Sequence, residues 1–211
     1  MRVTGVDASR RGWVAVTLDA PETAADRPGP VWVAAVRGHE SLAGVLDGDD
    51  AGVVGIDMPL GLPESGWREA DRTARGLLGP RRSSVFAIPP RAVWAQASYQ
   101  AANQVCRELT GQGFSIQAWG LRAKLLEADR YRGSCAHPLY EVHPELAFGV
   151  LAGMPLALSK HTAAGRELRV TDTLDAAAVA WSAWRIAAGR AVVIPGRPQH
   201  DRHGREIAIR Y

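Results

Sequence analysis

Two short segments of the chain each end in an aspartate that follows an apolar run, with a glycine two positions before the aspartate. They are Val3–Asp7, Val-Thr-Gly-Val-Asp, and Val53–Asp57, Val-Val-Gly-Ile-Asp. Residues two apart in a β-strand point to the same face, so Gly5 and Gly55 clear space on the surface that carries the two carboxylates. If the two strands are neighbours, Asp7 and Asp57 meet.

Two carboxylates held together in a partly apolar setting repel each other, and a cation between them favours the ionised state of both. A divalent ion, Mg2+ or Mn2+, is the expected cofactor, because Mg2+ prefers oxygen ligands and needs few protein groups. Two such ions about 4 Å apart can activate a water and stabilise a leaving oxygen in hydrolysis. Taken singly, each aspartate is also explained as a turn or cap residue after a strand.

A second group of acidic residues lies late in the chain. Glu141 and Glu145 flank His143 at the end of a predicted strand, and Asp172 and Asp175 share one face at the start of a predicted helix. Carboxylates are favoured at a helix N-terminus, so capping is an alternative explanation for the two aspartates. The histidine is either a proton shuttle or a structural residue. A first strand, a fourth strand and a late helix would each bring a carboxylate toward one end of the sheet.

The elements that position these acids follow from apolar alternation and turn residues. Strands are predicted at 3–6, 13–18, 31–36, 53–57 and 139–143, and helices at 40–46 and 171–188. The first two strands form a hairpin, and the return through the helix at 40–46 lays the fourth strand parallel in the same sheet. The predicted fold class is therefore α/β with a mixed sheet.

A mainly helical insertion is predicted after the fourth strand, over about 61–135. It holds 11 of the 25 Lys and Arg residues but 6 of the 22 Asp and Glu residues. A basic segment beside an acidic metal site suits a polyanion, although a solvated basic helix face is the alternative. Bidentate guanidinium groups match phosphate, which makes the cations of this segment and of a later loop candidates for phosphate binding. They are Arg72, Arg75, Arg81, Arg82, Lys160, Arg166 and Arg169.

Length and composition predict a single domain spanning residues 1–211. The chain is 46% hydrophobic, which is enough for a full core. Cys106 and Cys135 have no metal-binding or disulfide spacing. No apolar run of about 18 residues exists, and the N-terminus enters a strand, so no membrane contact and a cytoplasmic location are expected. The tail at 197–211 is expected to be flexible, or to form a short strand over 206–211.

Several motifs together carry a resemblance to a known family. They are Gly5-Val-Asp7, Gly12-Trp13, Gly55-Ile-Asp-Met-Pro-Leu-Gly61, Asp71 with Arg72 and Arg75, Ser84-Val-Phe86, Glu141-Val-His-Pro-Glu145, Lys160 with Gly165 and Arg169, and Asp172-Thr-Leu-Asp-Ala176. In these features the chain resembles the RNase H-like fold, and in particular the domain-of-unknown-function family 429 of predicted nucleases.

The resemblance implies a five-stranded mixed sheet flanked by helices, with the first and fourth strands adjacent. It also implies a metal-dependent phosphodiester hydrolase whose acids lie on the first strand, the fourth strand and the last helix. Carried over to this chain, these acids are Asp7, Asp57 and Asp175, with Asp172 as an accessory metal ligand. Glu141 is counted with the catalytic acids and Glu145 with the metal ligands, and which of the two glutamates binds metal stays open.

Two other functions remain as alternatives. The RNase H-like fold also underlies actin-like ATPases and sugar kinases, but those ATP-dependent phosphotransferases usually need two copies of the fold. A non-catalytic module that binds nucleic acid or a protein partner is the second alternative. The expected partner is nucleic acid or another phosphorylated substrate, with DNA, RNA and small metabolites not distinguished. A homodimer is compatible with this fold.

Overall fold

A computed structural model of the chain describes residues 1–20, 32–48, 50–132, 137–151 and 170–211. The chain forms two compact units. The sheet unit comprises Met1–Met58, Tyr131–Val192 and Arg210–Tyr211, and the helical unit comprises Pro59–Arg130 and Val193–Ile209. The helical unit therefore contains most of the insertion predicted at 61–135, together with a C-terminal segment that the sequence did not associate with it.

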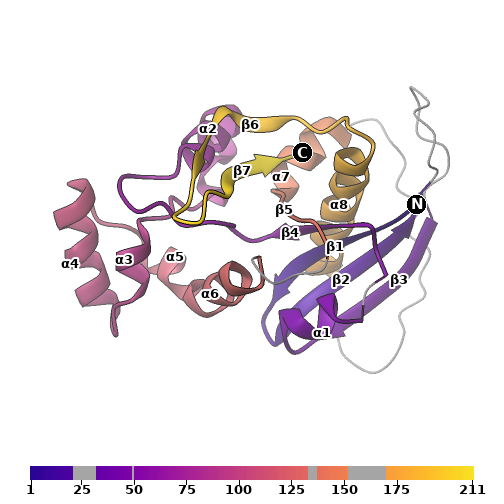
Figure 1. The fold of residues 1–211 in the computed structure, drawn as a ribbon, viewed down its shortest axis with the longest axis horizontal. Coiled ribbons are helices and arrows are strands. Elements are labelled where there is room, and N and C mark those ends of the chain that lie inside the picture. The colour runs from indigo at the N-terminus through magenta and orange to yellow at the C-terminus, as the bar shows by residue number, and fades with distance from the viewer. Residues whose placement is uncertain (21–31, 49, 133–136, 152–169) are drawn as a thin grey trace. The chain divides into compact units, whose positions relative to one another are not determined.

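The sheet unit is built on a five-stranded mixed sheet (Figure 1). Its strands are β1 (Arg2–Ser9), β2 (Gly12–Asp19), β3 (Trp32–His39), β4 (Val53–Asp57) and β5 (Leu139–Glu141). Their order is β3-β2-β1-β4-β5, with β1 antiparallel to β2 and parallel to β4. The predicted mixed sheet with adjacent first and fourth strands is confirmed.

The parallel pairing of β1 and β4 follows from the crossover between β3 and β4. The short helix α1 (Leu42–Leu46) lies in this crossover and is capped by Ser41, whose hydroxyl accepts from the Gly44 amide at 3.2 Å. Because the register pairs Val3 with Val53, it also pairs Asp7 with Asp57, the last residues of the two runs Val3–Asp7 and Val53–Asp57.

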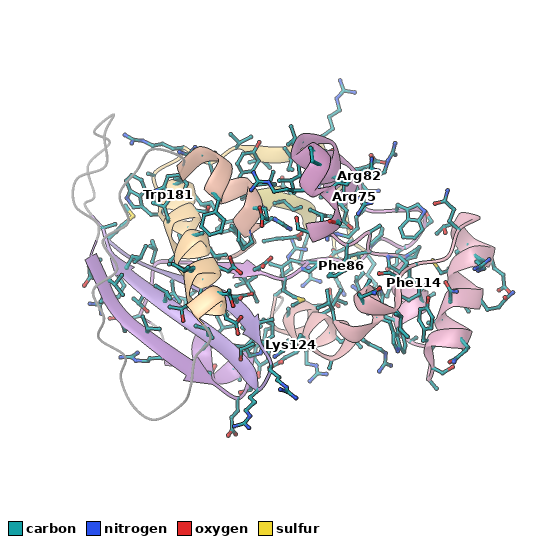
Figure 2. The ribbon with its side chains drawn as sticks, turned by 180° about the vertical axis from the view of Figure 1, so that it is seen from behind. Arg75, Arg82, Phe86, Phe114, Lys124 and Trp181 are labelled. Carbon is teal, nitrogen blue, oxygen red and sulfur yellow. The ribbon has the colours of Figure 1, made fainter. Side chains whose placement is uncertain are left out.

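Two helices of the sheet unit complete its core, α7 (Pro144–Leu151) and α8 (Val170–Ala187). Helix α8 packs on β1, β2 and β4, and α7 packs on α8. Residues 176–184 of α8 are all buried, which is the pattern of a helix covered on every side. The core joins alanines of α8 with Val14, Val16 and Leu18 of β2, and it includes Trp181, labelled in Figure 2.

The helical unit follows β4 and contains short helices and a two-stranded sheet. Its elements are α2 (Glu69–Leu78), the 3-10 helix η1 (Gly79–Ser84), α3 (Arg91–Trp94), α4 (Tyr99–Thr110), α5 (Ile116–Gly120), α6 (Arg122–Tyr131), β6 (Val193–His200) and β7 (Glu206–Arg210). An aromatic core joins α3, α4 and α5 with the chain before α5. Trp94 of α3 stacks on Trp119 of α5 at 6.2 Å, and Phe114 meets Trp94 edge-on at 5.6 Å and Tyr99 of α4 at 5.7 Å.

The C-terminal segment differs from the predicted flexible tail at 197–211. Strands β6 and β7 pair with each other, and Asp201 and Arg205 close the turn between them with a 2.9 Å backbone hydrogen bond. The short strand predicted at 206–211 corresponds to β7. No helix in the described part of the chain is long and apolar enough to cross a membrane.

Candidate functional site

Asp7 and Asp57 lie side by side at the carboxyl ends of two parallel strands. The register pairs the two residues directly, just as it pairs Gly5 with Gly55. Asp7 is buried, and its Oδ1 accepts a 2.6 Å hydrogen bond from the Ala8 amide, which orients the carboxylate. Asp57 is half-buried. The structure therefore brings together the two aspartates that the sequence predicts to meet.

The remaining predicted acids lie on β5, α7 and α8. Glu141 ends β5, pairs with Ile56 in the register and is only 5% exposed. Glu145 lies in the first turn of α7, and Asp172 in the first turn of α8, with Asp175 one turn further along. Five elements, three strands and two helices, thus carry acidic residues at or near one end.

The charges on these acids act on one another, and Asp57 shows this most clearly. Burial raises the pKa of Asp57 well above its ordinary value, and the charges of Asp7, Asp175 and Glu141 raise it further. A carboxyl group surrounded by other carboxylates stays protonated to higher pH, because ionisation would add another negative charge in a setting with little water. These four acids form one electrostatic cluster.

Asp175 connects this cluster to the two remaining acids. Burial raises the pKa of Asp175, and the charges of Glu145 and Asp172 raise it further. Helix α8 begins at Val170, so Asp172 lies inside the first turn and is not the N-cap that the capping alternative requires. We call Asp7, Asp57, Glu141, Glu145, Asp172 and Asp175 the carboxylate cluster.

The two glycines of the apolar runs explain how α8 can carry its acids so close to the strands. A Cβ atom on Gly5 would lie 2.6 Å from the Ala180 Cα and would also overlap the Ala180 amide and the Ala176 carbonyl. A Cβ atom on Gly55 would lie 3.0 Å from Cγ1 of Val179. The space that the sequence assigns to the acids is filled by the backbone of α8, and this close approach brings Asp175 toward Asp57.

The carboxylate cluster has the donor type that Mg2+ and Mn2+ bind, which is carboxylate oxygen. The raised pKa values also fit a cation site, since a bound cation would offset both the burial of these carboxylates and their mutual repulsion. In the described part of the chain, however, no three His, Cys, Asp or Glu side chains are arranged to hold a metal ion. The donors therefore fit the metal by the chemistry of their oxygen atoms and not by their present arrangement.

His143 lies between β5 and α7, within two residues of Glu141 and Glu145. It is half-buried, and its backbone carbonyl accepts from the amides of Leu146 and Ala147, both at 3.1 Å. The residue therefore helps to begin α7. Its role as a proton shuttle stays a prediction.

The predicted phosphate-binding arginines belong to the helical unit and have different environments. Arg72 is exposed and pairs with Glu69 at 2.6 Å. Arg75 donates from Nη1 to the carbonyls of Arg82 and Val85, so this edge of its guanidinium holds the chain after α2 in place (Figure 2). Arg81 and Arg82 are exposed on η1. Lys160, Arg166 and Arg169 lie outside the described residues.

One buried and one partly buried ion pair of the helical unit could not be predicted from the sequence. Arg68 is fully buried and donates to Asp71 at 2.8 Å, and the other oxygen of Asp71 accepts from the Ile88 amide at 2.8 Å. Arg91 binds Asp129 through both Nη atoms, at 2.7 and 3.1 Å. The i,i+3 spacing of Arg68 and Asp71 allowed the first pair, but spacing does not reveal burial.

These observations define a class of protein: an α/β chain with a β3-β2-β1-β4-β5 mixed sheet and a cluster of carboxylates where the parallel strands end. A family model described as "Protein of unknown function (DUF429)" matches residues 5–200. The chain therefore belongs to the DUF429 family, as its motifs predict. No curated protein and no solved structure matches it.

Proposed function

We propose that this chain is a metal-dependent phosphodiester hydrolase, and more narrowly a nuclease, whose reaction takes place at the carboxylate cluster. The observation that carries the proposal is the pairing of Asp7 with Asp57 at adjacent strand ends, where neighbouring acids raise the pKa of Asp57. A protein gains no stability from gathering acids in this way, so a function that uses their charge is the more economical explanation.

Asp7, Asp57 and Asp175 are the residues that would hold the metal, with Asp172 and one of the two glutamates completing the donor set. When bound, Mg2+ or Mn2+ would supply a water activated at neutral pH and a positive charge beside the leaving oxygen. The Ala8 amide orients Asp7, and the raised pKa of Asp57 favours its protonated form, which a bound cation would oppose. Glu141 is buried on the next strand, where the register pairs it with Ile56, and its charge acts on Asp57.

Substrate binding is assigned to the exposed arginines of the helical unit. That unit holds 13 Lys and Arg residues against 8 Asp and Glu residues, whereas the sheet unit holds 12 against 14. Several acids of the helical unit already pair with its own arginines, including Glu69 with Arg72 and Asp129 with Arg91. Arg72 is exposed but bonds Glu69, so Arg81 and Arg82, exposed on η1, are the better candidates to bind phosphates of the substrate.

The test is hydrolysis of labelled single-stranded and double-stranded DNA and RNA with Mg2+ or Mn2+. We expect cleavage that requires the metal, is abolished by EDTA and is lost in Asp7→Asn. Asp47→Asn is the matched control, because Asp47 is an exposed acid at the end of α1 and should leave cleavage unchanged. Mn2+ soaked into crystals should give anomalous density at the carboxylate cluster.

The other outcomes separate the alternatives. Metal-dependent hydrolysis that survives Asp7→Asn would contradict the assignment of the site. ATP-dependent phosphorylation without cleavage would establish a phosphotransferase, although the described residues form a single five-stranded sheet and a two-stranded one. Binding of nucleic acid without any cleavage, unchanged by Asp7→Asn, would establish a non-catalytic module.

A further inference from the structure

Helix α2, which precedes the exposed arginines of η1, begins without a capping side chain of its own. Arg68 occupies the N-cap position, and its side chain, which bonds the Asp71 carboxylate, caps no amide of the first turn. The first amides of a helix have no partner within the helix and need one from elsewhere. Gln199 of β6 supplies it, because its Oε1 accepts from the Glu69 amide at 2.8 Å and its Nε2 donates to the Trp67 carbonyl at 3.1 Å.

The turn that follows Gln199 is itself held in place by charged groups. Asp201 accepts from the amides of His203 and Arg205 at 2.9 and 3.0 Å, and from the Arg205 guanidinium at 2.8 Å. These hydrogen bonds keep the pKa of Asp201 below its ordinary value despite its burial. Arg205 also approaches Asp129 of α6 at 3.9 Å, and Asp129 binds Arg91 of α3. The β6–β7 hairpin is thus anchored to two helices of its unit.

Helix α2 in turn fixes the segment that carries the exposed arginines. Asp71 accepts from the Ile88 amide at 2.8 Å, and Arg75, one turn later, donates to the carbonyls of Arg82 and Val85 at 3.1 and 2.6 Å. Residues 82–88 are therefore bound to α2 at both ends, by Arg75 at residue 82 and by Asp71 at residue 88. A shift of α2 would move η1 with it.

We propose that Gln199 is a positioning residue: it sets the start of α2 and, through α2, the placement of Arg81 and Arg82 for phosphate binding. The hydrogen bond between the Glu69 amide and Gln199 joins residues that are 130 positions apart in the sequence. The DUF429 match ends at residue 200, so Asp201 and Arg205, which anchor the hairpin, lie beyond it. The positioning part of the proposal depends on the contacts above, and only the phosphate ligand rests on the proposed function.

Gln199→Met, made in the intact chain, tests the proposal. Methionine keeps the length of the side chain and removes both hydrogen bonds of Gln199. We expect hydrogen exchange of the Glu69 amide to accelerate about fivefold, as for loss of a helix cap. The apparent affinity for a fluorescein-labelled single-stranded oligonucleotide should fall several-fold. KM for a cleaved oligonucleotide should rise with kcat unchanged, since the loss is in binding and not in the reacting groups.

Gln104→Met is the matched control, because Gln104 bonds only an exposed residue of its own helix, Glu108, at 2.7 Å. It should leave exchange at Glu69, oligonucleotide affinity and KM unchanged. Gln199→Glu keeps the acceptor for the Glu69 amide and should retain most of its protection. If Gln199→Met lowers thermal stability without changing oligonucleotide affinity, Gln199 is merely structural and the proposal is overturned.

The failure of the proposed function is distinguishable from the failure of this inference. If the wild-type protein binds the oligonucleotide but does not cleave it, the hydrolase assignment fails while the exchange and affinity measurements still decide the role of Gln199. If the wild-type protein does not bind the oligonucleotide, the role of Gln199 in phosphate binding is overturned. Faster exchange at Glu69 together with weaker binding in Gln199→Met, and neither in Gln104→Met, supports the inference.

Discussion

Gly5→Ala is the substitution that most directly tests how the carboxylate cluster is assembled. The strand conformation of Gly5 accepts an L side chain, so the effect depends on space. The added Cβ would lie 2.6 Å from the Ala180 Cα and would overlap the Ala180 amide and the Ala176 carbonyl. All three atoms belong to the α8 backbone, which cannot turn aside as a flexible side chain can. Helix α8 must therefore move away from β1.

The expected magnitude follows from two opposing effects. Overpacking a core costs about 1–3 kcal/mol, and contact with helix backbone places Gly5→Ala near the upper end. Alanine in a strand recovers about 0.5–1 kcal/mol of backbone entropy relative to glycine. The net loss is about 2 kcal/mol, or roughly 4–8 °C in the melting temperature of a chain of this size. The movement of α8 would also separate Asp175 from Asp57.

Thermal and urea unfolding, with Mn2+ affinity measured on the same samples, test this reasoning. Gly55→Ala should cost less than Gly5→Ala, about 1 kcal/mol, because the added Cβ would lie 3.0 Å from Cγ1 and 3.1 Å from the carbonyl oxygen of Val179, so that α8 needs only a small adjustment. Gly149→Ala, in α7 with no atom within 4 Å, should stabilise the chain by up to about 1 kcal/mol. A Gly5→Ala protein with wild-type stability and wild-type Mn2+ affinity would refute the role given to this glycine.

Three further predictions concern other parts of the chain. The raised pKa of Asp57 means that the folded chain binds more protons than the unfolded chain above about pH 4. Stability without metal should therefore fall as the pH rises above about 4 and through the raised pKa of Asp57, and thermal unfolding of Asp57→Asn should show a smaller fall. Asp71→Asn should lower the free energy of unfolding in urea by about 3 kcal/mol, because it leaves the buried Arg68 without its carboxylate. Arg72→Ala should change the same free energy by less than about 1 kcal/mol, because the ion pair of Arg72 with Glu69 is exposed. Equal effects would contradict this ranking. Arg82→Gln should raise KM for an oligonucleotide and reduce the salt dependence of binding without changing Mn2+ affinity, and an unchanged salt slope would remove Arg82 from the binding surface.

The sheet was predictable because its strands are apolar runs bounded by turn residues, and because a helical crossover requires parallel pairing. The start of helix α8 at Val170 was predicted within one residue, because the alanine-rich run has a clear beginning at residue 171. The hairpin was not predicted as a whole. Its first strand contains Pro195 and Pro198 and several exposed residues, and the contact of Gln199 with α2 depends on residues more than a hundred positions away.

The types of residue in the candidate site were predictable, but their environments were not. Carboxylates at strand ends follow from the sequence, and register then places Asp7 beside Asp57. Charge pattern does not separate an arginine that binds a ligand from one that supports the fold. Arg75 is half-buried and bonds two backbone carbonyls, whereas Arg82 is exposed on η1. Only packing distinguishes the two residues.

The repeated Gly-x-Asp pattern has two physical causes, and the sequence shows only that they occur together. The aspartates contribute charge, and the glycines contribute the absence of a side chain where α8 crosses the strands. A larger residue at Gly5 would leave every carboxylate of the cluster in the sequence and yet move Asp175 away from Asp57. The close packing of α8 and the repulsion among the acids oppose each other, because the first holds together what the second would separate. The packing of α8 against β1 and β4 therefore holds the carboxylates together, and a cation that relieves the repulsion among them would stabilise the same arrangement.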